Sequence, residues 1–65
     1  SNRMNVIKVA GLKLTKEKFP NLYRMAESNP EGLEEQLQSL NQASGGKSDL
    51  LSTAINFEND LAHDG

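Results

Sequence analysis

The sequence predicts a mostly α-helical domain of the α+β class, in which one N-terminal β-strand precedes three short helices. Three observations predict it: a stretch rich in β-branched residues lies near the N-terminus, three later segments carry apolar residues at helical spacing, and proline or glycine separates these segments. With 65 residues, of which 35% are apolar, we expect residues 1–65 to form a single small domain and residues 1–4 and 63–65 to be disordered.

Residues 5–15 are rich in β-branched side chains and leucine, which favours an extended backbone. The apolar residues that set its register are Ile7, Val9, Leu12 and Leu14. Because two have odd and two have even numbers, an uninterrupted strand would place the pairs on opposite faces. A β-bulge or a tight hairpin at Ala10-Gly11 would return all four to one face and bring Lys8 and Lys13 together on the other. We favour the bulge, because alanine does not suit the first turn position and facing lysines repel each other.

A strand of this length is not stable alone, and a chain this short buries only about 60% of the surface that it exposes when unfolded. We therefore expect a homodimer, or a higher homo-oligomer, in which two copies pair their strands antiparallel and pool the apolar faces of their helices. The oligomer interface of this hypothesis consists of Ile7, Val9, Leu12 and Leu14.

The first helix is expected over residues 20–28, with Pro20 in its first position. A looser turn, capped by Thr15, precedes it. The apolar residues that follow helical spacing in this region are Phe19, Leu22, Tyr23 and Ala26.

The second helix is expected to begin with Asn29 as its N-cap and Pro30 in its first position. Its apolar side is a narrow leucine seam of Leu33, Leu37 and Leu40. The stretch Ala43-Ser44-Gly45-Gly46 ends the helix, because glycine readily adopts the left-handed conformation of a C-terminal cap.

The third helix is expected to begin after Ser48, its predicted N-cap, and to fray from His63 onward. Its apolar seam consists of Leu50, Ala54, Phe57 and Leu61, and Leu51, Ile55 and Ala62 widen it. A stripe this wide needs cover on two sides. We expect the second helix to cover one side, and the first helix or a partner chain to cover the other.

The sequence has no cysteine, which excludes disulfides and thiolate metal sites and indicates a reducing, cytoplasmic setting. No apolar run approaches the roughly 18 residues of a membrane span, so we expect no membrane partner. Gly45-Gly46-Lys47-Ser48 ends like a phosphate-binding loop, but Asn41 stands where that motif needs glycine. We interpret it as a helix end followed by a helix N-cap.

The single histidine, His63, has too few neighbouring ligands to hold a metal, and no second histidine can serve as base to a serine. The acidic pairs Glu34-Glu35 and Glu58-Asp60 are expected to face solvent, where nothing would adapt them to acid–base catalysis. A chain this small can hardly enclose a ligand-sized cavity. We therefore expect no catalytic residue, no cofactor, no metal and no enzymatic activity.

The net charge of −2 conceals an uneven distribution. Residues 1–24 hold six basic residues and one acid, whereas residues 25–65 hold one lysine and eight acids. This division suits either a cationic surface for an anionic partner or two copies that bring opposite charges together. Our main interpretation is a small, non-catalytic regulatory module that binds itself and another protein. Tyr23, Arg24 and Met25 are the predicted contact residues, because aromatic, Arg and Met side chains are enriched at interfaces.

A DNA-binding repressor is the alternative, because a β-ribbon formed by two chains can enter the major groove. Its contact residues would be Arg3, Asn5, Lys8 and Lys13. In the order of its elements, the segment 5–44 resembles the ribbon-helix-helix repressors, which implies a dimeric transcriptional regulator. The second helix departs from that pattern, since Asn29-Pro30-Glu31 places a carboxylate where the family contacts phosphate. The sequence pI near 5.2 also counts against nucleic acid as a partner.

Overall fold

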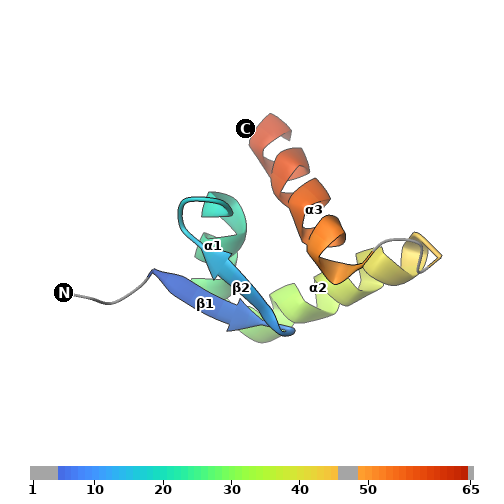
Figure 1. Cartoon of the computed structure of the whole chain (residues 1–65), viewed down its shortest axis with the longest axis horizontal. Helices are drawn as coiled ribbons and strands as arrows, with labels where there is room; N and C mark the ends of the chain where they lie inside the picture. The colour runs from blue at the N-terminus through green and yellow to red at the C-terminus, as the bar shows by residue number, and fades with distance from the viewer. Residues whose placement is uncertain (1–4, 46–48, 65) are drawn as a thin grey trace.

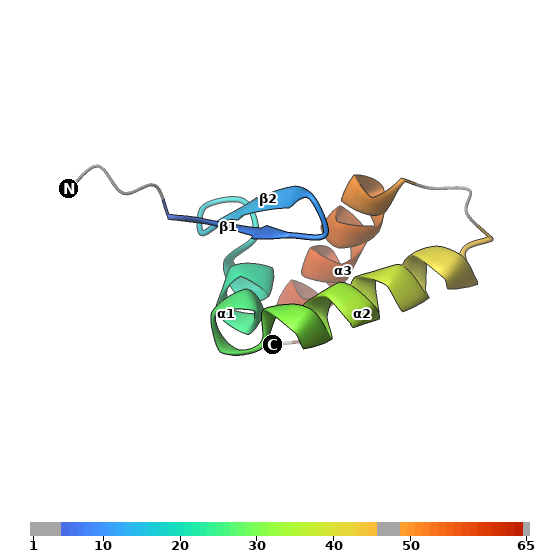
Figure 2. The ribbon, with the colours of Figure 1, turned by 90° about the horizontal axis from the view of Figure 1, so that it is seen from below.

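The computed structural model describes residues 5–45 and 49–64, which form a two-stranded antiparallel sheet followed by three helices (Figure 1). The elements are β1 (Val6–Val9), β2 (Leu12–Thr15), α1 (Pro20–Ser28), α2 (Pro30–Ala43) and α3 (Leu50–Asp64). The predicted mostly α-helical fold with an N-terminal strand region is confirmed. Figure 2 shows the hairpin as one layer, with α1 and α2 below it and the start of α3 beside its turn.

Residues 5–15 form a tight hairpin within one chain, so the β-bulge that we favoured is wrong. The strands pair in the register Val6↔Thr15, Ile7↔Leu14, Lys8↔Lys13 and Val9↔Leu12. Ala10 and Gly11 form the two-residue turn, with φ angles of 54° and 81°. Both lie in the left-handed region, which glycine adopts freely and alanine adopts at a cost of about 1 kcal/mol. The hairpin offsets this cost by pairing Ile7 with Leu14 and Val9 with Leu12, and exposure to solvent screens the facing lysines.

The second strand, which we expected from another copy of the chain, is therefore supplied by the same chain. Val9 and Leu14 are 3% and 0% exposed and belong to the core that the helices of this chain form. Ile7 and Leu12 are half-buried against the same core. The exposed parts of these two side chains are the apolar surface of this face that a second copy could contact. Pairing between copies stays a prediction.

The core lies where the hairpin, α1 and α2 meet, and α3 closes it from the side. Its fully buried leucines are Leu14, Leu22, Leu33 and Leu37. One polar contact also joins α2 to α3, because the Nδ2 group of Asn41 donates a hydrogen bond of 3.3 Å to Oγ1 of Thr53. In the described part of the chain, no buried side-chain nitrogen or oxygen lacks a hydrogen-bond partner.

The predicted helix boundaries are largely confirmed. Oδ1 of Asn29 accepts a hydrogen bond of 3.0 Å from the amide of Gly32, which caps α2, and Gly45 follows α2 with a φ of 76°. Ser48, the predicted cap of α3, lies outside the described residues. The adjacent Asp49 accepts a hydrogen bond of 2.8 Å from the amide of Ser52. Helix α3 continues through Asp64, past His63, the residue from which we expected it to fray.

Replacing Ala10 by asparagine should stabilise the protein, because Asn-Gly adopts the left-handed turn with less strain than Ala-Gly. We expect the free energy of unfolding to rise by roughly 0.5–1 kcal/mol, which corresponds to about 3–6 °C in thermal midpoint for a domain of this size. Ala10→Val is the control that should lower the midpoint, since a β-branched residue is strained at positive φ. Equal midpoints for all three proteins would contradict the hairpin turn.

The cap of α3 predicts a dependence of stability on pH. The hydrogen bond from Ser52 holds the pKa of Asp49 below its ordinary value of 3.8. A carboxylate whose pKa is lowered by folding stabilises the native state above its unfolded pKa, and this contribution disappears as the pH falls through the folded pKa. Asp49→Ala should therefore lower the thermal midpoint at pH 7, and the difference from the native sequence should shrink as the pH is taken below 3.8. A difference independent of pH would contradict the cap.

Candidate functional site

Helix α1 begins without a capping residue of its own. Phe19 at its N-cap position makes no side-chain hydrogen bond, and Pro20 in the first position has no amide hydrogen. The carboxylate of Glu58, from α3, takes the place of the local cap. Its Oε2 accepts hydrogen bonds from the amide of Asn21 at 3.2 Å and from Nδ2 of Asn21 at 2.9 Å, and its Oε1 accepts one from the amide of Leu22 at 2.9 Å.

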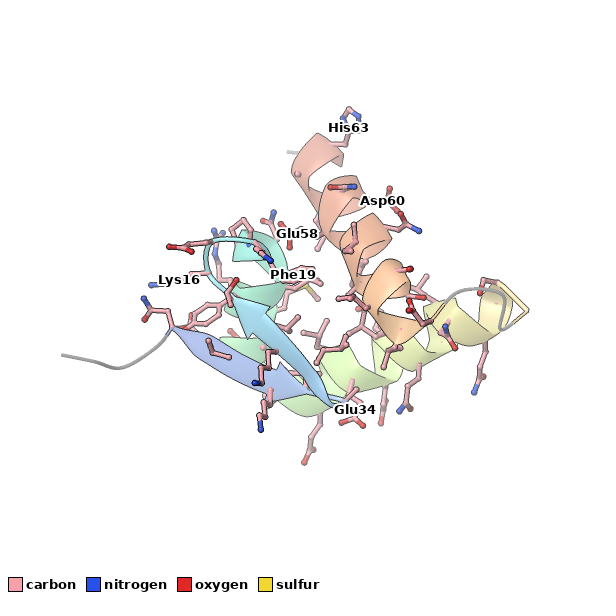
Figure 3. The ribbon with its side chains drawn as sticks, in the orientation of Figure 1. Lys16, Phe19, Glu34, Glu58, Asp60 and His63 are labelled. Atoms are coloured by element: carbon pink, nitrogen blue, oxygen red, sulfur yellow. The ribbon has the colours of Figure 1, made fainter. Side chains whose placement is uncertain are left out.

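Glu58 is 6% exposed, so the prediction that its carboxylate faces solvent is wrong. Figure 3 shows it on the side of α3 that faces α1, near Phe19. Three donors and the positive end of the α1 dipole compensate the burial of the charge. Asp60, the other acid of that predicted pair, is exposed as expected. The carboxylate of Glu58 therefore fixes the distance between α3 and the start of α1.

A groove of about 430 Å³ lies between β2 and α3. We call it the β2–α3 groove. Its lining includes Lys13, Lys18, Phe19, Leu51, Ile55 and Glu58. It is partly open to solvent, and Figure 1 shows that α3 leans away from β2.

The α3 wall of this groove is apolar and uncovered. Leu51 is 47% exposed and Ile55 is 44% exposed, and the two lie one helical turn apart. Both belong to the wide apolar stripe for which we predicted cover on two sides. In the structure α2 and α1 both pack against α3, so the two covers that we expected are supplied by this chain. They do not reach the edge of the stripe, where Leu51 and Ile55 remain open to solvent.

The opposite rim of the groove is basic. Lys13 of β2 and Lys18 of the β2–α1 loop line it, and both side chains are exposed. The acid in the lining is Glu58, and both of its oxygens already accept hydrogen bonds from the start of α1. The groove thus combines an apolar wall with two exposed lysines, whose positive charge favours anionic groups of a ligand.

Over the described ranges, no single groove is lined by all three predicted protein-contact residues, Tyr23, Arg24 and Met25. Arg24 and Met25 line a second, more open groove of about 520 Å³ beside α1 and α2. Tyr23 does not line that groove. It is buried, with Nζ of Lys16 lying 5.6 Å from the centre of its ring, and it lines a smaller pocket of about 260 Å³ together with Arg24. Met25 is half-buried against the core, and Arg24 is exposed. Leu51 and Ile55 of α3 are more exposed than Tyr23 and Met25. The sequence pattern did not predict this difference, because all four residues follow helical spacing.

The residues predicted for the DNA-binding alternative are partly brought together. Lys8 and Lys13 are cross-strand partners on the exposed face of the hairpin, and Asn5 is exposed just before β1. Arg3 lies outside the described residues. A ribbon with two lysines is therefore present, although both of its strands come from one chain.

Residues 5–45 and 49–64 contain no group of three side chains able to hold a metal ion, and no helix long and apolar enough to cross a membrane. His63 is exposed near the end of α3 (Figure 3). No protein-family model, no curated protein and no solved structure matches this chain.

Replacing Glu58 by glutamine should destabilise the protein, because the amide group has one acceptor oxygen in place of two and no charge. We expect a loss of about 2–3 kcal/mol in the free energy of unfolding, the range of buried hydrogen bonds to charged groups. Glu35→Gln is the matched control, since Glu35 is exposed on α2 and its replacement should change stability by less than about 0.5 kcal/mol. Urea denaturation of the three proteins measures both values, and equal stability of the two variants would exclude Glu58 as a structural cap.

Proposed function

We propose that this chain is a small, non-catalytic protein-interaction module that binds a segment of another protein in the β2–α3 groove. The observation that carries this proposal is the exposure of Leu51 and Ile55, side by side, on one wall of a groove. Covering the exposed half of two such side chains contributes about 2 kcal/mol to binding, and grooves of this kind serve as recognition sites. The absence of cysteine supports a cytoplasmic location as part of this proposal.

Substituting both groove residues should abolish partner binding without unfolding the protein. Leu51→Gln/Ile55→Gln keeps good helix formers in α3 and removes the apolar wall. Leu40→Gln is the matched control, because Leu40 is 40% exposed on α2 and does not line the groove. In affinity capture from the native host, a protein partner should be retained by the native sequence and by Leu40→Gln and lost by the double variant. Circular dichroism should show the same helicity for all three, and equal capture would refute the proposal.

Nucleic-acid binding by the hairpin is the second candidate, favoured by the exposed cross-strand pair Lys8 and Lys13. Lys8 belongs to the ribbon face alone, Lys18 lines the groove alone, and Lys13 belongs to both. If the hairpin binds DNA, a mobility shift should appear at low salt, weaken steeply at moderate salt, and weaken in Lys8→Ala but not in Lys18→Ala. Absence of a mobility shift at low salt would exclude nucleic-acid binding by the hairpin.

A further inference from the structure

Building on the proposed function, we propose that the segment bound in the β2–α3 groove is an acidic, amphipathic helix of another protein. Three features of the groove carry it: the charge of its rim, the spacing of its apolar residues, and the unsuitability of a second copy of this chain as the occupant.

The two lysines at the rim of the groove favour an occupant with negative charge. Lys13 on β2 and Lys18 on the β2–α1 loop are exposed and line the groove together with Leu51 and Ile55 of α3, so an occupant that covers the two apolar residues also lies beside both lysines. The carboxylate of Glu58 does not neutralise them for the occupant, because its hydrogen bonds are directed to α1. Asp60 is exposed but is not part of the groove lining. Glutamate or aspartate on the occupant would complement this charge.

The spacing of the apolar residues along α3 favours a helical occupant. Leu51 and Ile55 are four residues apart on α3, and the exposed Ala62 continues the same stripe toward the end of the helix. A second helix with apolar residues at i, i+3 or i+4, and i+7 can lay its apolar side along such a stripe. Phe19, nearly buried in the groove lining, provides an apolar base for one of these side chains.

A second copy of this chain fits the groove poorly. Its acidic helix, α2, buries its own leucines Leu33 and Leu37, and Leu40 is the large apolar side chain that α2 exposes. A symmetric contact between two β2–α3 grooves would bring Lys13 and Lys18 of both copies into one interface, where like charges oppose association. The complement of this groove is therefore a different protein.

Selection from an unbiased peptide library tests the inference. A displayed library of random peptides of about 16 residues, long enough for four helical turns, is selected on the full chain and counter-selected on Leu51→Gln/Ile55→Gln. The enriched peptides should carry net negative charge and apolar residues at helical spacing. A synthetic copy of the best one should gain helicity on binding, as measured by circular dichroism.

The affinity of that synthetic peptide, measured by fluorescence anisotropy, tests whether Lys13 and Lys18 contribute to binding. Lys13→Gln/Lys18→Gln should weaken binding by roughly five- to tenfold, the effect of two exposed ion pairs. Lys8→Gln, on the ribbon face, should leave the affinity unchanged. Neutral or basic peptides that still require Leu51 and Ile55 would overturn the acidic partner and leave the proposed function standing. Failure to enrich any groove-dependent peptide would overturn both.

Light scattering tests the second copy directly. We expect the native chain to be a monomer. If it forms an oligomer through another surface, the Ile55→Lys variant should have the same mass as the native chain. Twice the mass for the native chain and a single mass for Ile55→Lys would show that a second copy occupies the groove, and would overturn the acidic-helix partner.

Discussion

The hydrogen bonds between the carboxylate of Glu58 and the start of α1 determine how this small chain closes. Helix α1 begins with Phe19-Pro20, a pair that offers no side-chain acceptor, and the amides of Asn21 and Leu22 would otherwise be unpaired near the core. A carboxylate brought from α3 satisfies both. This contact holds α3 against α1 while its other side stays separate from β2, and the β2–α3 groove is the result.

Local rules predict much of this fold. The parity of Ile7, Val9, Leu12 and Leu14 required an interruption at Ala10-Gly11, and both solutions that we weighed gave the same buried face. The choice between them was wrong, because the strain of one alanine is smaller than the gain from pairing two strands within the chain. The cap of α2 followed from Asn29, and the cap of the turn before α1 followed from Thr15, since these interactions involve neighbouring residues.

The candidate site depends on contacts between distant parts of the chain, and the sequence predicts it less completely. The wide stripe that includes Leu51 and Ile55 indicated that α3 needs a second cover, but nothing local showed that Lys13 and Lys18 lie across from it. We predicted that Glu58 faces solvent because glutamate is a charged residue type. Its spacing from Ala54 and Leu61 placed it beside the core, and the missing cap of α1 was the signal that could have assigned its role.

Amide hydrogen exchange at Leu22 is the most direct measurement of the contact between Glu58 and α1. The amide of Leu22 lies in the first turn of a helix, where an uncapped amide exchanges readily with solvent. The structure predicts exchange as slow as that of Leu37 in the core, and a large acceleration at Leu22 in Glu58→Gln relative to Leu37. Rapid exchange at Leu22 in the native chain, unchanged by the substitution, would contradict the account.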